Sequence, residues 1–187
     1  MAKSAATKTA TRAPAFAGRQ FGAKNVRLAV LEPAHRIALR APAASLAALS
    51  KALDLKLPTA PKTSTSKGTR SALWLGPDEW LVIDDGERDP LADCAGVQAL
   101  HSAVGVSHRN VAISVIGPAA AATLNAGCPQ DLSLAAFPIG ASTRTVLGKV
   151  EIVILRTGEQ TFRVECWRSF SDYVLGFLVE AANDAAA

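Results

Sequence analysis

The sequence predicts an α+β fold made of two split β-α-β (ferredoxin-like) halves, each with a mainly antiparallel sheet. Three observations lead to this prediction. Two apolar runs enclose a Gly-Pro-Asp turn between residues 73 and 84, as in a pair of antiparallel strands. A strand pattern followed by an Ala-rich helix pattern occurs twice, at 36–53 and at 111–125. The last third of the chain is typical of paired strands separated by turns and closes with an amphipathic helix near 170–182.

The first half begins with a strand over 36–40, where apolar and polar residues alternate. Pro42 suits the first turn of the helix that follows. The apolar face of this helix recurs at three- and four-residue steps, at Leu46, Leu49 and Leu53. The segment 56–69 holds prolines, lysines and several Ser or Thr residues without a periodic apolar signal. We therefore expect a mobile loop there.

Strands are predicted at 71–76 and 80–84, joined by a turn in which Pro77 presets the backbone angle. A helix is predicted at 90–100, although a glycine inside it weakens the helical preference. A further strand at 102–107 completes the first half.

The second half repeats this order. Residues 111–116 alternate as a strand, Gly117-Pro118 interrupts it, and 119–125 form a helix. The loop 129–140 carries four large apolar residues, which we expect to hold it onto the body. Further strands are predicted at 142–147, 150–156 and 160–166, before the closing helix.

These elements predict three regions: a disordered basic tail at 1–24, a first α+β half at 25–108, and a second at 109–187 that packs with the first as one body. After Met1, residues 2–20 contain a single large apolar residue, Phe16, so the segment 1–20 cannot offset the loss of chain entropy by burial. Six cations precede Glu32 in a chain of net charge +4, so the remainder carries a net charge of −2. The positive charge therefore belongs to the tail.

Several interpretations of the tail remain open. A secretory signal would need an apolar stretch after its charges, which the tail does not contain, and a transit peptide fits only in part. A nucleic-acid-binding arm is possible, because Lys and Arg release counterions from phosphates. The simplest interpretation is a solvated extension of a cytoplasmic protein.

Composition points to a soluble protein of a reducing compartment. The apolar runs are short and interrupted, well below the roughly 20 residues that cross a bilayer, so no membrane contact is predicted. The three cysteines, Cys94, Cys128 and Cys166, form no C-x-x-C pair and have no histidine at zinc spacing. Reduced thiols are therefore expected.

No catalytic, cofactor-binding or metal-binding residue is predicted. In Ser107-His108-Arg109, neighbouring strand residues point to opposite faces, so a polar cluster at a strand end is favoured over a nucleophile with its base. The three histidines lie far apart, without acidic residues at metal-ligand spacing. The Gly-Pro steps remove an amide donor where a phosphate loop would use one. Cys128 is expected to be a small buried residue in a turn.

The residues that remain are candidates for a protein–protein interface. Aromatic and arginine side chains are the usual anchors of interfaces, although they also occur in cores and at helix starts. The candidates are Trp74, Trp80, Arg109, Trp167, Phe170 and Tyr173.

Four segments, taken in order, resemble the gamma subunit family of heterotetrameric sarcosine oxidase. They are Ala72-Leu73-Trp74-Leu75-Gly76-Pro77-Asp78-Glu79-Trp80-Leu81, Val106-Ser107-His108-Arg109-Asn110-Val111-Ala112, the pair 127–132 and 137–140, and Arg168-Ser169-Phe170-Ser171-Asp172-Tyr173. The first is the most specific, and the resemblance runs from about residue 25 to 182.

The resemblance implies a fold similar to the folate-binding aminomethyltransferases. It also implies a bacterial, cytoplasmic complex that converts sarcosine and oxygen to glycine and hydrogen peroxide, with the methyl group passed to tetrahydrofolate or released as formaldehyde. In that family FAD, FMN and NAD belong to the alpha and beta subunits, zinc to delta, and folate to alpha. The gamma chain would then be a non-catalytic partner of the alpha, beta and delta subunits.

Two other functions remain open. The chain could be a stand-alone folate-dependent one-carbon transferase, or it could bind nucleic acid through its tail. Nucleic acid is not the expected partner, because the body is mildly acidic and has no basic stripe. A membrane is not expected either, because the apolar runs are short.

Overall fold

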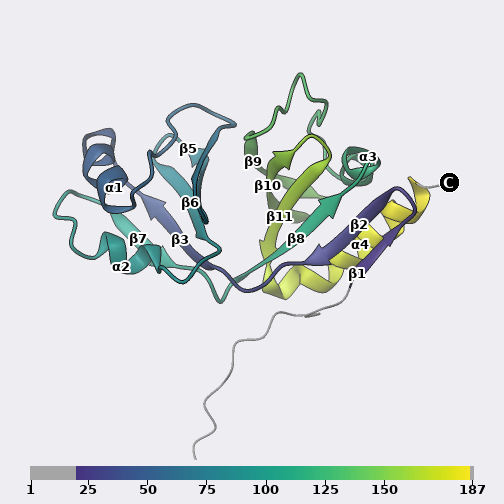
Figure 1. The fold of residues 1–187 in the computed structure, drawn as a ribbon, viewed down its shortest axis with the longest axis horizontal. Coiled ribbons are helices and arrows are strands. Elements are labelled where there is room, and N and C mark those ends of the chain that lie inside the picture. The colour runs from purple at the N-terminus through teal and green to yellow at the C-terminus, as the bar shows by residue number, and fades with distance from the viewer. Residues whose placement is uncertain (1–19, 186–187) are drawn as a thin grey trace, which may run out of the picture.

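The computed structural model describes residues 20–185. Two antiparallel sheets lie beside each other in the middle of the molecule, and helices lie on their outer sides (Figure 1). Sheet A has the order β1-β2-β8-β11-β10-β9, and sheet B has the order β4-β5-β6-β3-β7. This arrangement confirms the predicted α+β fold with two mainly antiparallel sheets.

The strands of sheet A are β1 (Gln20–Ala23), β2 (Val26–Val30), β8 (Asn110–Ile116), β9 (Ser142–Leu147), β10 (Val150–Gly158) and β11 (Thr161–Trp167). Those of sheet B are β3 (His35–Arg40), β4 (Ser64–Lys67), β5 (Arg70–Gly76), β6 (Glu79–Asp84) and β7 (Ser102–Gly105). The helices are α1 (Leu46–Ala52), α2 (Pro90–Cys94), α3 (Ala120–Asn125) and α4 (Ser171–Asp184), with short 3-10 turns η1 (Ala43–Ser45) and η2 (Arg168–Phe170).

The two sheets follow one plan. In sheet B the order β5-β6-β3-β7 is that of a split β-α-β unit, and β4 extends it at one edge. In sheet A the order β10-β11-β8-β2 is equivalent, and β9 extends it at the same relative edge. The place that β7 holds in sheet B is therefore held in sheet A by β2, a strand from the other end of the chain.

The edge strands β4 and β9 meet at a point that relates the two halves. Thr63 and Ala141 form an isolated antiparallel bridge. Ser64 N–H donates to Gly140 O at 3.0 Å, and Ser142 N–H donates to Lys62 O at 3.2 Å. The equivalent residues of the two halves thus exchange equivalent bonds, as expected of an internal two-fold relation.

Two of the expected boundaries differ from the structure. Residues 20–23 were expected in the disordered tail but form β1, because Phe21 packs on the core of sheet A and β2 supplies the pairing. Strand β2 lies within 25–108 but pairs with β8, so this part of the chain contributes to both sheets. Residues 1–19 of the predicted tail lie outside the described residues.

Two element predictions in the first half also change. Strand β4 lies inside the expected loop at 56–69, because β5 offers a free edge with which this polar segment can pair. Helix α2 ends at Cys94 rather than near residue 100. In the second half the loop 129–140 is held by Leu132 and Phe137, which are buried, whereas Leu134 and Ile139 are exposed.

Three apolar clusters hold these layers together. The largest lies between sheet A and helices α3 and α4, and a second lies between sheet B and helices α1 and α2. The third joins the two sheets, with Leu73, Leu81 and Ile83 of sheet B against Val153 and Leu155 of β10. The halves therefore pack as one body through their sheets.

Candidate protein–protein interface

An exposed aromatic pair stands where β11 ends and the C-terminal helix begins. Along β11, Phe162, Val164 and Cys166 are buried toward the helices. Trp167, one residue further, points to the other face and remains 40% exposed. Phe170, at the end of η2, is 43% exposed, and its ring centroid lies 6.0 Å from that of Trp167. These two rings form an apolar surface in contact with solvent.

A guanidinium group covers one side of this pair. The Cζ atom of Arg109 lies 5.2 Å from the centroid of the Trp167 ring, and its Nε donates to Asn110 Oδ1 at 3.3 Å. The Arg168 N–H donates to Arg109 O at 2.6 Å, which ties the two segments together. Within residues 20–185, Arg109 forms no ion pair with a carboxylate. Arg109, Trp167 and Phe170 together form what we term the aromatic patch.

A second aromatic pair lies on the first turns of α4. Tyr173, 41% exposed, has its ring centroid 6.2 Å from that of Phe177. Two glycines make room for these rings. A Cβ on Gly148 would lie 2.4 Å from Tyr173 Oη, and a Cβ on Gly127 would lie 2.5 Å from the Phe177 ring. Phe177 was not among the interface candidates predicted from the sequence. Its i+4 spacing from Tyr173, which places both rings on one side of the helix, was a signal for it.

The other two tryptophans lie elsewhere. Trp80 is 1% exposed, packs in the core between sheet B and its helices, and donates its indole N–H to Pro58 O at 2.7 Å. The prediction that Trp80 belongs to an interface is therefore wrong, because no partner can reach a side chain so enclosed. Trp74 pairs with Trp80 across β5 and β6 and is half-buried. Its indole N–H has no partner among the described residues.

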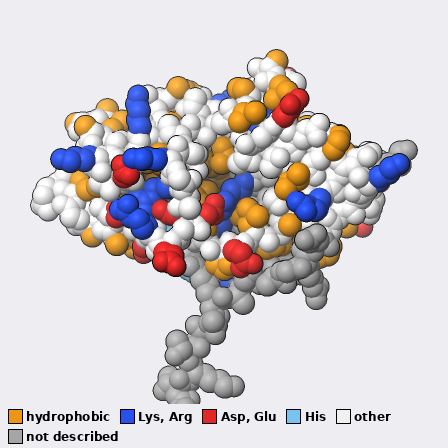
Figure 2. All heavy atoms as spheres, viewed as in Figure 1, with side chains coloured by type: hydrophobic (Ala, Val, Ile, Leu, Met, Phe, Trp, Pro, Cys, Tyr) orange, Lys and Arg blue, Asp and Glu red, His pale blue; other side chains and the backbone are white. Residues whose placement is uncertain are grey.

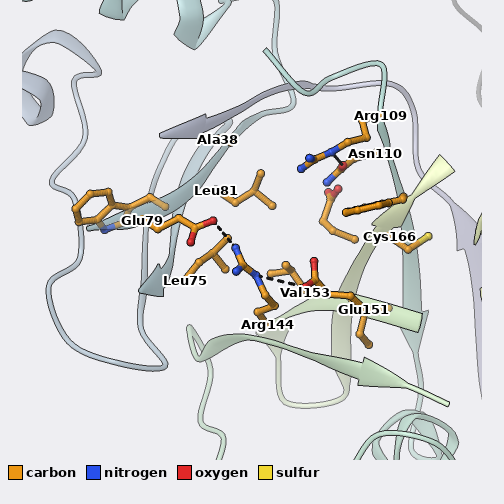
Figure 3. A pocket seen from close by; sticks show the side chains of 14 residues that line it. Ala38, Leu75, Glu79, Leu81, Arg109, Asn110, Arg144, Glu151, Val153 and Cys166 are labelled. Carbon is orange, nitrogen blue, oxygen red and sulfur yellow. Dashed lines mark hydrogen bonds and ion pairs between the residues drawn. The ribbon is translucent and has the colours of Figure 1, made fainter. Parts of the chain in front are cut away.

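A narrow groove runs between the two sheets (Figure 3). Arg144 of β9 reaches across it to Glu79 of β6, with Nη2 2.5 Å from Oε1, and lies 4.0 Å from Glu151. Arg109 and Trp167 line the same groove. In Figure 2, acidic and basic side chains meet near the middle of this face, where the two halves adjoin.

The groove is too small for a cofactor. Its volume is about 40 Å³, whereas sites for drug-sized ligands usually occupy about 300–1,000 Å³. Among residues 20–185 no group of three or more His, Cys, Asp or Glu side chains is placed to hold a metal ion. The polar residues of the groove instead link the two sheets, as the ion pair between Arg144 of β9 and Glu79 of β6 does.

Deeper between the sheets lies a buried ionic cluster. Arg36 of β3 holds Glu165 of β11 in a bidentate contact of 2.7 and 3.1 Å. Arg163 donates to the same carboxylate at 2.8 Å and to Asp85 at 2.7 Å. Burial alone would raise the pKa of Glu165, but the charges and hydrogen bonds of the two arginines outweigh it and lower this pKa. Glu165 is thus an ionised cross-link between the sheets.

The polar cluster expected at 107–109 has a structural role. Ser107 Oγ accepts the Arg36 N–H at 2.7 Å and donates to Arg36 O at 3.2 Å. Its hydroxyl is therefore bonded to the main chain of β3, and the neighbouring His108 is exposed. In the part of the chain that the structure covers, all three cysteines are free and buried. Burial also raises the pKa of the Cys166 thiol to about 12, which makes it a poor nucleophile.

The chain is similar in sequence to known proteins over most of its length. Residues 38–184 match the family model described as sarcosine oxidase, gamma subunit family. The sarcosine oxidase subunit gamma of Corynebacterium sp. strain U-96 is 31% identical over 150 residues, which are 75% of this chain and 70% of that protein. The subunit of the same name from Corynebacterium sp. strain P-1 is 31% identical over 173 residues, 88% of this chain and 84% of that protein.

Two solved structures share the fold. A chain of the heterotetrameric sarcosine oxidase from Corynebacterium sp. U-96, in complex with pyrrole 2-carboxylate, aligns with a TM-score of 0.83 and 29% identity over 89% of each chain. The glycine cleavage system aminomethyltransferase T from Bartonella henselae aligns with a TM-score of 0.64 and 15% identity, over 87% of this chain and 49% of that chain. At that identity the second likeness concerns the fold alone.

Proposed function

Because this chain belongs to the sarcosine oxidase gamma subunit family, we propose that it is the gamma subunit of a heterotetrameric sarcosine oxidase and serves in its assembly. The observation that carries this proposal is the match over 89% of this chain to a chain of such a heterotetramer. The complex would oxidatively demethylate sarcosine to glycine, with hydrogen peroxide and either formaldehyde or methylene-tetrahydrofolate as the other products.

In this proposal the chemistry belongs to the partner subunits. The alpha, beta and delta subunits would hold FAD, FMN, NAD, tetrahydrofolate and zinc. This chain would contribute a folded body and a docking surface. The small volume of the groove supports this division, because the two sheets fill the space between them with their own side chains.

We further propose that the aromatic patch contacts a partner subunit, with Tyr173 and Phe177 beside it. Arginine, tryptophan and tyrosine are the residues that most often dominate binding energy at interfaces. Trp167 and Phe170 leave apolar rings in solvent, and Arg109 has no counter-ion within the described residues. Trp74, half-buried on the other sheet, would be at most a marginal contact.

Cytoplasmic localisation is part of the same proposal. The three cysteines are unpaired, as expected in a reducing compartment. In the described part of the chain, no helix has the length and apolar character needed to cross a membrane.

Co-purification tests the proposed function. The chain, expressed with the alpha, beta and delta subunits of the same organism and carrying an affinity tag, is expected to elute with them on gel filtration. Trp167→Ala should weaken this association about tenfold or more while leaving the chain folded, because a central aromatic anchor is lost from an already exposed position. Ile139→Ala, at a residue that is 60% exposed on another loop, is the matched control. A wild-type chain that elutes alone would refute the subunit proposal.

Titration with tetrahydrofolate separates this function from that of a stand-alone transferase. The subunit proposal predicts no saturable binding by the isolated chain. Binding at micromolar concentration would favour the transferase instead and would require the groove between the sheets to open.

A further inference from the structure

The two sheets differ at one edge. Sheet A has six strands and sheet B has five, although both follow the same plan. In sheet A, β1 pairs along the outer side of β2. In sheet B the equivalent strand is β7, and in residues 20–185 no strand pairs along its outer side. The place that corresponds to β1 is therefore empty in sheet B.

The edge at β7 is unusually apolar for a surface. Leu100, just before the strand, is 77% exposed, and Val104 within it is 54% exposed. Leu91 of α2 is 37% exposed and lies beside the strand, since a Cβ on Gly105 would be 3.4 Å from its side chain. Three large apolar side chains thus surround a strand that carries no charged residue.

Two residues of β7 have main-chain N–H and C=O groups that do not pair with β3. β7 pairs with β3 in the register Ile37↔Gly105 to Arg40↔Ser102, and the ladder continues with the Val106 N–H donating to Arg36 O at 2.9 Å. Bonded and non-bonded pairs alternate in an antiparallel ladder. The N–H and C=O groups of Ala103 and Gly105 must therefore point away from β3, toward the free edge.

The other three edges carry features that discourage pairing, and β7 does not. β4 is a run of hydroxyl residues that ends in Lys67, and β9 presents Arg144. β1 contains Gly22 at φ +133, where a Cβ would lie 2.2 Å from Val26 O, so its backbone is irregular. Charges and irregular backbone are the usual means of protecting an edge strand.

From these observations we propose that β7 receives an extended segment of another subunit, which adds a sixth strand to sheet B. The segment pairs with the main chain of Ala103 and Gly105 and places neutral, apolar side chains on Leu100 and Val104. Strand addition of this kind takes its affinity from main-chain hydrogen bonds and its specificity from alternate side chains. The inference rests on the proposed function, because the segment comes from the sarcosine oxidase complex.

Hydrogen exchange measured on the assembled complex tests the pairing directly. The amides of Ala103 and Gly105 are expected to exchange rapidly in the isolated full-length chain and roughly 100-fold or more slowly in the complex, because only a bound strand can accept their protons. Fast exchange at both amides in an intact complex would overturn the strand proposal and leave the proposed function standing. Failure of the wild-type chain to assemble at all would instead refute the proposed function.

Two substitutions provide a second test. Ala103→Pro removes a donor that faces outward, so the ladder with β3 keeps its bonds. Val104→Lys adds a charge at an exposed position of the same edge. Each is expected to weaken assembly about tenfold while far-UV circular dichroism stays unchanged. The matched control is Ser66→Pro on β4, where the exposed residue also turns its N–H outward from the sheet.

The outcomes distinguish the possible occupants. Folded Ala103→Pro and Val104→Lys chains that assemble as well as Ser66→Pro would overturn the proposal. A second copy of this chain could also fill the edge. Dimers of the isolated chain on gel filtration that are abolished by Val104→Lys would show that case, and would overturn the assignment to another subunit.

Discussion

Between the two sheets, three charged residues are buried together. Glu165 is 2% exposed and is held by Arg36 and Arg163, which are themselves buried. A buried ion pair need not add net stability over an apolar replacement, but the loss of one member leaves the others uncompensated. The cluster is therefore sensitive to any change that removes a single charge.

Glu165→Gln is expected to lower the free energy of unfolding by about 3–5 kcal/mol, because it leaves the buried Arg36 without a carboxylate and leaves Arg163 with Asp85 alone. Urea unfolding of the purified chain measures this. Glu151→Gln, at a carboxylate whose side chain is 52% exposed, should change stability by less than about 0.5 kcal/mol. Equal effects of the two substitutions would contradict the role assigned to Glu165.

The same carboxylate predicts a dependence on pH. Burial raises the pKa of Glu165, yet its two arginines bring it below the usual glutamate value of 4.5. A group with a lowered pKa stabilises the folded state above its unfolded value and loses that contribution as the pH falls through its folded value. Unfolding free energies measured between pH 7 and pH 3 should therefore fall more steeply below about pH 4.5 in the wild type than in Glu165→Gln. Parallel curves would contradict this assignment.

The effect of removing a tryptophan on stability should depend on whether its ring is buried, as at Trp80, or exposed, as at Trp167. Trp80→Ala should cost about 3–5 kcal/mol in unfolding free energy, because it empties a fully buried site and removes the hydrogen bond to Pro58. Thermal or urea unfolding checks this on the isolated chain. Trp167→Ala, at an exposed ring, should cost less than about 1 kcal/mol in the same assay. A small effect at Trp80 would show that the chain repacks around the missing ring.

At the scale of the elements, two equivalent turns allow a controlled comparison. Gly68 joins β4 to β5 at φ +58, and Gly148 joins β9 to β10 at φ +59. A Cβ on Gly68 would meet nothing within 4 Å, whereas one on Gly148 would lie 2.4 Å from Tyr173 Oη. Both turns thus require a left-handed backbone conformation, but only at Gly148 would an added Cβ also clash with a side chain.

Gly68→Ala is expected to cost about 1–2 kcal/mol, the usual penalty of a left-handed conformation for an L-residue. Gly148→Ala should cost more, because it must also displace Tyr173 from its seat on the turn. Chemical unfolding of the two variants gives the difference. Equal costs would mean that Tyr173 moves aside freely.

The elements also show what local patterns can and cannot predict. Local patterns predicted β3, β8 and β11 closely. Burial does not alternate along β8 and β11, however, because five consecutive residues of each strand are buried. β4 was missed because its sequence is polar, and it is a strand only because the edge of β5 lies open beside it. The internal repeat could have predicted β4. In the second half, β9 precedes and pairs with β10, so an equivalent strand before 71–76 was to be expected in the first half.

For the whole molecule, the contacts between the sheets decide how it unfolds. Leu73, Leu81 and Val153 form a shared apolar cluster, and Arg36 joins Glu165 across the same layer. Shared cores of this kind make the unfolding of two halves cooperative. The halves are thus expected to behave as one unit.

A single unfolding transition is therefore expected for the isolated chain. Tryptophan fluorescence, to which Trp74 and Trp80 of sheet B contribute, and far-UV circular dichroism, which reports on both halves, should give the same midpoint in urea. Two separated transitions would show that the halves unfold independently. Val153→Asp places a charge in the shared apolar cluster. This variant is expected to show two separate unfolding transitions where the wild-type chain shows one.

The candidate interface was predictable in part. Arg109, Trp167 and Phe170 were predicted as interface candidates by residue type, and they lie together at the surface. Trp80 has the same residue type but is buried, and exposure cannot be inferred from type alone. The apolar edge at β7 was not predicted, because Val104 alternates like any core residue and is exposed because no strand within residues 20–185 lies beside β7.

Sequence alone determined the class of fold, most of the elements, the family, and the separation of a basic N-terminal segment from a mildly acidic body. These properties follow from local periodicity, composition and ordered motifs, all of which depend on residues that are close together in the sequence. Only the tertiary structure decided that β2 joins sheet A, that Trp80 is core while Trp167 is exposed, and that sheet B has one strand fewer than sheet A within residues 20–185. Each of these depends on which distant segments pair, and pairing is settled by long-range burial and hydrogen bonding rather than by local pattern.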